Sequence, residues 1–251
     1  MDDPGASRLA AAAVARGLET VRVGTGPEAD LRVVDLRLHG HGSDFAVERS
    51  GERIGRVMLE IPGRHYVLDA AVALAAGLRT GVPFADLARG LAAYTGARRR
   101  MERKGVAGGV RVYDSYAHHP TEIRSDLQAA RTIAGDGRLV VCFQPHLASR
   151  TRIFATAMGQ ALSAADAEVV TDVYLAREAA EAGVSGRLVA DAVALPADLV
   201  RYQPDVGDVP GELADLVGGG DLVLTLGAGD VTDVGPRLLA MLASTAREVR
   251  S

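Results

Sequence analysis

The stretch Val110-Arg111-Val112-Tyr113-Asp114-Ser115-Tyr116-Ala117-His118-His119-Pro120-Thr121-Glu122 joins a short apolar run to the start of a helix-competent segment. The run at 110–113 predicts a buried strand. Pro120 suits the first turn of the following helix, where its missing N–H would have no partner. In an open α/β sheet, ligands bind at the carboxyl ends of strands. We therefore expect the polar cluster 114–122 to line a ligand site, where exposed helix amides can receive an anion.

The rest of the second half repeats this order of strand and helix. Short apolar runs alternate with longer segments of helical periodicity. The predicted strands are 110–113, 139–143, 168–171 and 222–226, and the predicted helices are 121–133, 151–164, 188–193, 211–217 and 231–242. Alternation of this kind is typical of a parallel sheet with helices on both faces. We therefore predict an α/β fold for this half.

The N-terminal part follows a different pattern. Apolar and polar residues tend to alternate between 31 and 61, which indicates antiparallel strands. The other expected elements are an alanine-rich helix at 7–16, a short β-branched run at 20–23, and helices at 66–78 and 83–94. The hydrophobic pattern breaks in the Gly- and Arg-rich stretch 96–109. We place there the boundary between a domain of residues 1–103 and a domain of residues 104–251.

Composition excludes several classes of function. The 251 residues carry a formal net charge of −4, so they have no general attraction to nucleic acid or anionic membranes. No apolar stretch reaches the roughly 18 residues of a membrane span. The N-terminal residues Met1-Asp2-Asp3 are acidic rather than basic, so a cytoplasmic protein is expected. The single cysteine, Cys142, lies in an apolar run and is expected to be a buried, inert thiol.

Two further polar clusters follow predicted strands. The stretch Gln144-Pro145-His146-Leu147-Ala148-Ser149-Arg150-Thr151-Arg152 comes after the strand at 139–143, and it would lie beside the first cluster if the two strands are neighbours. Gly227-Ala228-Gly229-Asp230 lacks the third glycine of a dinucleotide fingerprint and is more typical of a tight turn. A purely structural interpretation remains open for the same residues, with His119, Thr121, Ser149 and Thr151 as helix caps and Arg150 and Arg152 as solvated charges.

Three features bear on phosphate and metal chemistry. Arg98-Arg99-Arg100 can clamp phosphate oxygens, because each guanidinium presents a planar fork of donors, although an isolated charge run is more often a solvated face. His118 and His119 invite a zinc site, but sequence neighbours rarely reach one ion and no ligand set accompanies them, so no metal site is predicted. Lys104 is the single lysine and no Gly-x-x-x-x-Gly-Lys-Ser/Thr motif occurs, so the sequence has no recognisable P-loop.

Taken together, these clusters resemble the Mur ligase family, and in particular its alanine-adding branch. The matching segments, in chain order, are Asp2-Asp3-Pro4-Gly5, Pro62-Gly63-Arg64-His65, Gly96-x-x-Arg99-Arg100, Asp114 to Glu122, Phe143-Gln144-Pro145-His146, Ser149-Arg150-Thr151, Thr171-Asp172-Val173-Tyr174 and Gly227 to Asp230. The resemblance implies a Rossmann-like C-terminal domain at 104–251. It also implies that residues 1–103 are the distal part of a central ATPase domain, without its P-loop.

The resemblance further implies a reaction. Family members use ATP and Mg²⁺ to phosphorylate a carboxylate, here that of UDP-N-acetylmuramate, and the amine of L-alanine then attacks the acyl phosphate. A portion without the P-loop is expected to be inactive alone, to carry no catalytic residue of its own, and to have a possible separate N-terminal half as partner. The implied substrate contacts are Tyr116, His118, His119, His146 and Arg150, and the implied nucleotide contacts are His65, Arg99, Arg100 and Asp114.

Three departures from the family pattern support a competing hypothesis. Ser115 stands where the family usually has aspartate, Leu147 where it commonly has arginine, and Tyr66 where it usually has asparagine. Weakened polar contacts at these positions favour a degenerate, non-catalytic binding module. A third alternative is the related ligase that attaches a recycled peptide to the same sugar, although the Phe-Gln-Pro-His and Asp-Val-Tyr segments favour the alanine-adding branch.

Overall fold

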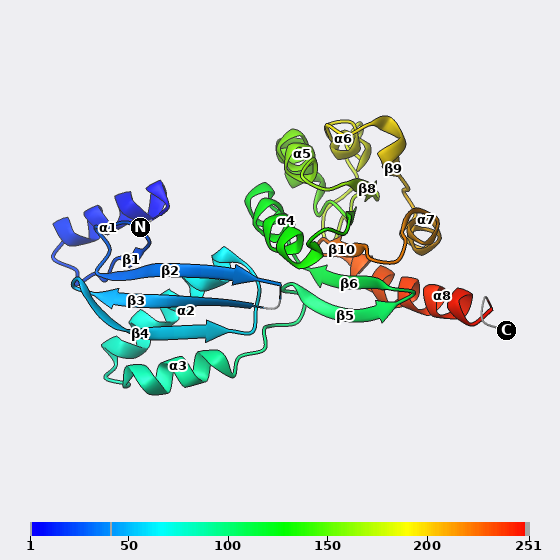
Figure 1. The fold of residues 1–251 in the computed structure, drawn as a ribbon. Coiled ribbons are helices and arrows are strands. Elements are labelled where there is room, and N and C mark those ends of the chain that lie inside the picture. The colour runs from blue at the N-terminus through cyan, green and yellow to red at the C-terminus, as the bar shows by residue number, and fades with distance from the viewer. Residues whose placement is uncertain (1, 41, 249–251) are drawn as a thin grey trace. The chain divides into compact units, whose positions relative to one another are not determined.

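The computed structural model describes residues 2–40 and 42–248, and the chain divides into two compact units, Met1–Thr95 and Gly96–Ser251 (Figure 1). The division falls before the predicted boundary at 103/104. Strand β5 (Glu102–Ala107), which was not predicted, pairs antiparallel with β6 (Val110–Ser115) and therefore belongs to the second unit. The Gly- and Arg-rich composition of this stretch concealed the strand.

The first unit contains the antiparallel strands and helices that the sequence predicts. Its sheet has the order β1-β2-β3-β4, in which β1 is parallel to β2 and the other pairs are antiparallel. The elements are α1 (Pro4–Ala15), β1 (Val23–Gly24), β2 (Leu31–His39), β3 (Gly42–Arg49), β4 (Glu52–Leu59), α2 (Arg64–Arg79) and α3 (Phe84–Ala92). Residue 41, which follows β2 and precedes β3 in the sequence, lies outside the described residues.

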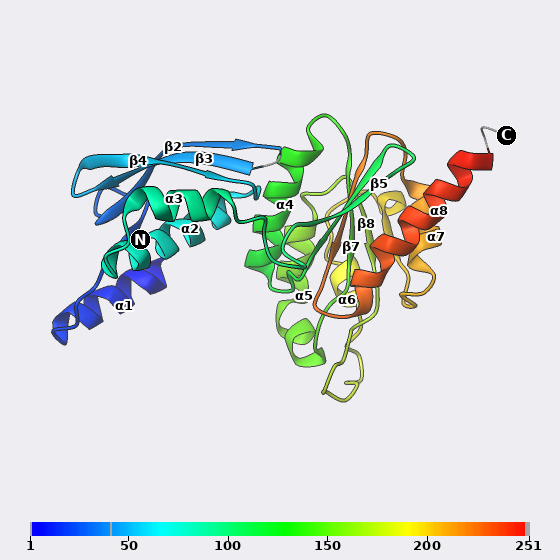
Figure 2. The ribbon, with the colours of Figure 1, turned by 90° about the horizontal axis from the view of Figure 1, so that it is seen from below.

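One face of this sheet is covered by helices. Figure 2 shows α2 and α3 on the same side of the strands. Phe45 and Val57 of the sheet pack with Val67 and Leu74 of α2 in one buried cluster. Gly55 has a φ of +155°, and a Cβ atom there would lie 2.2 Å from the ring of Phe84, so glycine is required where α3 meets β4.

The second unit has the predicted α/β fold. Its sheet has the order β5-β6-β10-β7-β8-β9, and every pair is parallel except β5 with β6. The elements after β6 are α4 (Pro120–Ala134), β7 (Leu139–Phe143), α5 (Ala148–Leu162), β8 (Ala167–Val170), α6 (Arg187–Ala190), β9 (Val200–Tyr202), α7 (Val209–Leu216), β10 (Leu222–Leu226) and α8 (Val234–Glu248), with short 3-10 helices at Ala197–Leu199 and Asp230–Asp233. Strand β9 was missed because three half-buried edge residues carry no periodic signal.

The strand order changes one expectation about the site. Strands β6 and β7 are not neighbours, because β10 lies between them and pairs with both. The polar clusters after β6 and β7 are therefore separated by the Gly-Ala-Gly-Asp turn that follows β10. All three clusters begin at the carboxyl ends of their strands, on the same side of the sheet.

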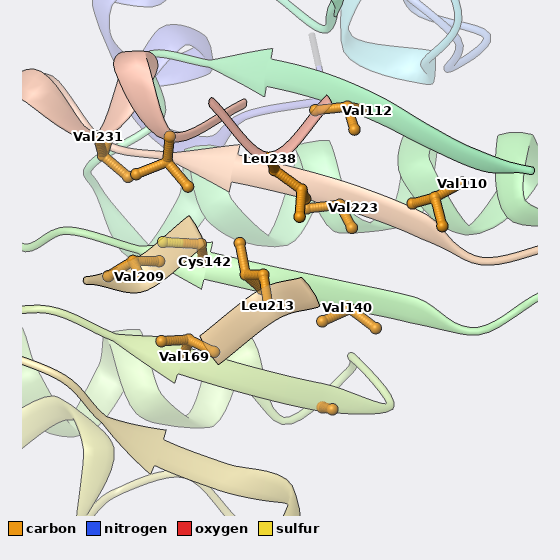
Figure 3. Packing of buried hydrophobic residues seen from close by; sticks show 12 residues of the cluster. Val110, Val112, Val140, Cys142, Val169, Val209, Leu213, Val223, Val231 and Leu238 are labelled. Atoms are coloured by element: carbon orange, nitrogen blue, oxygen red, sulfur yellow. The ribbon is translucent and has the colours of Figure 1, made fainter. Parts of the chain in front are cut away.

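Helices cover both faces of the second sheet (Figure 2), and the core on the α7 and α8 face is built from small branched side chains. Figure 3 shows Val140, Cys142 and Val223 of the sheet facing Leu213 of α7 and Leu238 of α8. Cys142 is fully buried, as predicted, and burial raises the pKa of its thiol, with smaller contributions from Glu168 and Asp114. Among the described residues, no helix is both long and apolar enough to cross a membrane.

A buried carboxyl group lies within the second sheet. Glu168 of β8 is fully buried, and neither of its carboxyl oxygens has a hydrogen-bond partner among the described residues. Burial raises the pKa of Glu168 well above its ordinary value. The folded state therefore retains a proton on this group at pH values at which the unfolded chain has lost it.

The free energy of unfolding should depend on pH because of this proton. Between the unfolded pKa, about 4.3, and the raised folded pKa, the Glu168 contribution to the free energy of unfolding should fall by about 1.4 kcal/mol per pH unit as pH rises. Glu168→Leu should remove this slope, so that the variant gains stability over the wild type increasingly as pH rises above the unfolded pKa. Thermal unfolding at several pH values measures the difference, and a difference that does not change with pH would contradict the assignment.

The first unit also exposes an apolar groove. Helix α1 has no buried residue, and its Leu9 side chain is 72% exposed. The groove has a volume of about 520 Å³ and is lined largely by alanine, leucine and valine side chains of α1, β1 and α2. Strand β1 is the outermost strand of this sheet and lies beside the groove.

The chain should therefore self-associate through this groove. Size-exclusion chromatography with light scattering should detect dimers or larger species, and the double substitution of Leu9→Glu with Val72→Glu should shift the protein toward monomer. Met58→Glu is the matched control, because Met58 is also exposed in this unit but does not line the groove. A monodisperse wild-type monomer would disprove the prediction.

Candidate functional site

The carboxyl ends of three adjacent strands bring the predicted polar clusters together. Ser115 of β6 and Phe143 of β7 are both register partners of Leu226 in β10. The segments that follow these residues therefore leave the sheet side by side. Strand β8 ends in the same row, because Val170 pairs with Phe143.

Four aromatic side chains, here called the ring row, lie next to one another at the carboxyl ends of these strands: Tyr116, His118, His146 and Tyr174. The ring centroids of Tyr116 and His118 are 5.4 Å apart, those of His118 and His146 are 5.6 Å apart, and those of His146 and Tyr174 are 5.9 Å apart. The first two contacts are edge-on and the third is stacked, and all three fall in the range of favourable aromatic pairs. The row brings together three predicted substrate contacts from two separate clusters.

The turn after β10 has no room for a side chain where it passes Tyr174 of the ring row. A Cβ atom on Gly229 would lie 2.5 Å from Cγ of Tyr174 and 2.3 Å from Oε1 of Gln144. The Gln144 amide donates to Asp230 over 2.7 Å and accepts from the backbone N–H of Val231 over 3.2 Å. The Gly-Ala-Gly segment is thus a tight turn, and its lack of side chains lets Tyr174 approach.

Asp114 lies beneath the site rather than on its surface. Its side chain is fully buried, and its oxygens accept hydrogen bonds from Thr225 and Thr232, each over 2.7 Å, and from Arg99 over 3.3 Å. Lys104 lies 3.8 Å from the same carboxylate. These contacts, here called the Asp114 network, give the carboxylate a complete set of partners within the protein.

The two arginines predicted to contact the nucleotide, Arg99 and Arg100, lie in different environments. The Arg99 guanidinium donates to the carbonyl oxygens of Gly227 over 2.5 Å and Ala228 over 3.4 Å, and it lies 5.0 Å from the centroid of the Tyr116 ring. Arg99 is therefore occupied within the protein. Arg100 is exposed and contributes its charge near Glu122. Of these two residues, Arg100 is the more exposed.

The two adjacent histidines have different surroundings. The Nδ1 of His119 accepts the backbone N–H of Thr121 over 3.3 Å, so this residue caps α4, as the structural interpretation predicts. The His119 ring contacts Phe154, with centroids 5.1 Å apart, and it is not part of the ring row. The Nδ1 of His118 lies 2.9 Å from the carbonyl oxygen of Tyr116.

Glu122 holds the turn that carries these histidines. Its carboxylate accepts the backbone N–H of His118 over 3.0 Å and that of His119 over 3.2 Å, which completes a capping box. Burial alone would raise the pKa of Glu122. The two N–H groups and the charges of His118 and Arg100 outweigh burial, so the pKa is lowered and the carboxylate is ionised at neutral pH.

The imidazole of His146 lies between the stacked ring of Tyr174 and the guanidinium of Arg150. Its Nδ1 lies 3.3 Å from the guanidinium of Arg150, one helical turn later in α5. Partial burial lowers the pKa of His146, and the charges of His118, Arg150 and Arg177 lower it further against the opposing effect of Glu178. The imidazole is therefore neutral at pH 7.

The start of α5 differs from the structural interpretation. Neither Ser149 nor Thr151 caps this helix, because the carboxylate of Glu178 accepts both the backbone N–H of Ser149 over 2.9 Å and its hydroxyl over 2.6 Å. The Thr151 hydroxyl instead donates to the carbonyl oxygen of Leu147 over 2.9 Å. Leu147 itself has a φ of 71°, an uncommon conformation for a non-glycine residue.

One of the other two departures from the family pattern, Ser115, has a local explanation. Ser115 is fully buried, and its hydroxyl donates to the carboxylate of Asp126 in α4. This position points into the protein, so the serine does not remove a carboxylate from the surface of the site. His65 lies in the first unit, at the start of α2, where its ring contacts that of Tyr66 with centroids 4.0 Å apart.

The structure adds Tyr174 to the predicted residues. Its backbone N–H donates to the carbonyl oxygen of Pro145 over 2.8 Å, and its carbonyl oxygen accepts the N–H of Leu147 over 3.0 Å, so the segment after β8 is tied to the segment after β7. The sequence signal was available, because Tyr174 follows a predicted strand just as Tyr116 does. Within residues 2–40 and 42–248, no group of three or more metal-ligating side chains is assembled.

Comparisons with known proteins identify the family of this chain. A family profile described as "Mur ligase, glutamate ligase domain" matches residues 99–229. Two curated relatives are UDP-N-acetylmuramate–L-alanine ligases. The protein from Nocardioides sp. is 56% identical over 241 residues, which are 96% of this chain and 49% of the relative. The protein from Kineococcus radiotolerans is 51% identical over 242 residues, which are 96% of this chain and 51% of the relative.

A solved structure shares the fold. The UDP-N-acetylmuramate-alanine ligase from Thermotoga maritima matches with a TM-score of 0.76 at 24% sequence identity, covering 91% of this chain and 49% of that one. This likeness concerns the fold alone. The chain spans about half the length of the curated relatives it matches.

The charge environment of His146 can be tested directly. Arg150→Met removes a cation that opposes protonation of the ring, so the pKa of His146 should rise toward the ordinary value of about 6.5. An NMR titration of the histidine ring protons measures this pKa. Arg152→Met is the matched control, because Arg152 lies in the same helix but pairs with Glu181. Equal effects of the two substitutions would contradict the assignment.

Proposed function

This chain belongs to the Mur ligase family and corresponds to the C-terminal portion of its alanine-adding members, and from that premise we propose that it supplies the amino-acid side of an ATP-dependent amide ligase. The proposed reaction joins L-alanine to UDP-N-acetylmuramate. The chain spans about half the length of its relatives, so the proposal includes a partner that carries the remaining parts of the site. It also retains the cytoplasmic location predicted from the sequence.

The observation that carries the proposal is the ring row with Arg150 at its side. A free amino acid has a cationic amine and an anionic carboxylate close together. Aromatic faces and imidazole nitrogens suit the amine, and a guanidinium suits the carboxylate. Tyr116 and His118 supply the first kind of group, and Arg150, whose guanidinium lies 3.3 Å from Nδ1 of His146, supplies the second.

The residues of this chain fit only part of the phosphate chemistry. ATP would supply the phosphoryl group that activates the carboxylate, and Arg100 is an exposed guanidinium that can neutralise phosphate oxygens. Arg99 supports Arg100 by fixing the linker, and His65 in the first unit is the proposed contact to the base. The described residues offer no cluster suited to Mg²⁺. We assign the Mg²⁺ ligands and the phosphate-binding loop to the partner.

The proposed partner is a polypeptide equivalent to the remaining half of the relatives. The apolar groove of α1, β1 and α2 supports this proposal, because a parallel edge strand beside an uncovered apolar surface suits further sheet and helix. The competing hypothesis of a degenerate binding module has lost part of its basis, since Ser115 is buried against Asp126. Leu147 and Tyr66 still favour that module.

Complementation decides between the two hypotheses. The purified chain should be mixed or co-expressed with the N-terminal half of the Nocardioides relative, and phosphate release and amide product should be measured with ATP, Mg²⁺, UDP-N-acetylmuramate and L-alanine. The mixture should turn over only with L-alanine present, and the chain alone should not. Binding of the two halves without turnover would favour the non-catalytic module.

Substitutions of Arg99 and Arg100 should have different effects in the same assay. Arg100→Met should lower turnover by about a hundredfold, as expected for the loss of one group that stabilises phosphoryl charge, and leave the thermal midpoint unchanged. Arg99→Met should lower the thermal midpoint, because it breaks the Asp114 network and leaves a buried carboxylate short of a partner. A large loss of stability in Arg100→Met would contradict this division of roles.

A further inference from the structure

The hydrogen bond of His118 fixes where this ring carries its proton. Nδ1 of His118 lies 2.9 Å from the carbonyl oxygen of Tyr116. A carbonyl oxygen can only accept, so Nδ1 must donate and must carry hydrogen. In the neutral ring, Nε2 is then the nitrogen with a free lone pair. Nε2 of His118 has no hydrogen-bond partner within the described part of the chain.

The neighbouring histidine has the opposite arrangement. Nδ1 of His146 lies 3.3 Å from the guanidinium of Arg150. Guanidinium groups only donate, so Nδ1 of the neutral ring must accept and Nε2 must carry the proton. His146 is the ring whose protonation is opposed by burial and by nearby cations. Its free nitrogen is therefore a donor, whereas the free nitrogen of His118 is an acceptor.

We propose that the two histidines are held in opposite neutral tautomers, and that Glu122 is the positioning residue that fixes the tautomer of His118. The inference rests on the proposed function for the identity of the ligand. It assigns the lone pair of His118 Nε2 to an N–H of the amino acid's amine. The N–H of His146 Nε2, together with Arg150, is assigned to an oxygen of its carboxylate.

Glu122 acts on His118 through the backbone. Its carboxylate accepts the N–H groups of residues 118 and 119, over 3.0 and 3.2 Å, and so holds the turn in which the Tyr116 carbonyl faces the ring of His118. The same carboxylate oxygen lies 3.6 Å from Nδ1 of His118. Loss of the carboxylate should release the turn and the tautomer together.

The pair gives the site a preference for one class of ligand. The two ring centroids are 5.6 Å apart, so an acceptor and a donor are presented next to one another. A compact molecule with an amine and a carboxylate on one carbon can satisfy both. A simple amine or a simple carboxylate would leave one of the two nitrogens unpaired, which costs binding energy in a partly buried site.

NMR of the chain without substrate tests the tautomers. The chain has six histidines, so ¹⁵N-histidine labelling gives six rings that single His→Gln substitutions can assign. Long-range ¹H–¹⁵N correlation at pH 8 should show hydrogen on Nδ1 of His118 and on Nε2 of His146. Hydrogen on Nε2 of His118, with or without a second proton on Nδ1, would overturn the inference.

Two variants test the role of Glu122. Glu122→Gln keeps an acceptor for the capping box and should retain the Nδ1–H form of His118. Glu122→Ala should release it to a mixture of tautomers and leave His146 unchanged. The thermal midpoint of each variant identifies a folding defect, and Ser125→Ala controls for the loss of another side-chain bond to the backbone of α4. Retention of the Nδ1–H form in a folded Glu122→Ala variant would refute the positioning role.

The complemented enzyme gives an independent readout. Glu122→Ala should raise the KM for L-alanine about tenfold, the effect of one lost hydrogen bond, whereas Glu122→Gln should stay within about twofold of wild type. The KM for ATP should not change with either variant. Failure of the wild-type mixture to turn over would reject the proposed function alone, because the tautomers are measured in the resting chain.

Discussion

The buried carboxylate of Asp114 is the contact on which the arrangement of the second unit depends. It lies at the end of β6 and accepts hydrogen bonds from Thr225 of β10, from Thr232 after the turn, and from Arg99 of the linker. A buried carboxylate is tolerated only when its charge and its lone pairs are matched by partners. The network therefore favours the one arrangement in which the linker, β6 and the end of β10 meet. The ring row begins at that junction, because Arg99 also lies over Tyr116.

The position of β10 makes this network possible. The last strand of the chain enters between β6 and β7, so the site is complete only when the C-terminal part of the sheet has folded. The glycines after β10 then pass beside residues from two other strands, and Gly229 leaves room for Tyr174 and Gln144. Residues that are far apart in the sequence thus become mutually dependent. Such long-range pairing is slow to form, but it couples the integrity of the site to the integrity of the fold.

The sequence predicted the elements better than the directions of their side chains. Short but nearly continuous apolar runs identified the central strands, because a strand that is buried on both faces is hydrophobic at almost every position. Strand β5 was hidden by its charged and glycine residues, and β9 by its length. Motif matching predicted Asp114 and Arg99 as ligand contacts, but it could not show that Asp114 is fully buried or that the partly buried Arg99 donates to backbone carbonyl oxygens. Sequence spacing could not distinguish Arg99 from Arg100, because that choice depends on the backbone of the linker, where Arg99 has a φ of 57°.

The serine at position 115 shows how a departure from a motif can be read in three dimensions. Successive residues of a strand point to opposite faces, and Ser115 points toward α4, where its hydroxyl donates to Asp126. An aspartate at 115 would bring a second carboxylate against Asp126 in a buried setting, and two such groups cannot both be ionised without a large penalty. Serine and Asp126 therefore fit as a pair, with one donor and one acceptor. The substitution is explained by packing within the second unit, so it does not by itself indicate a loss of ligand binding.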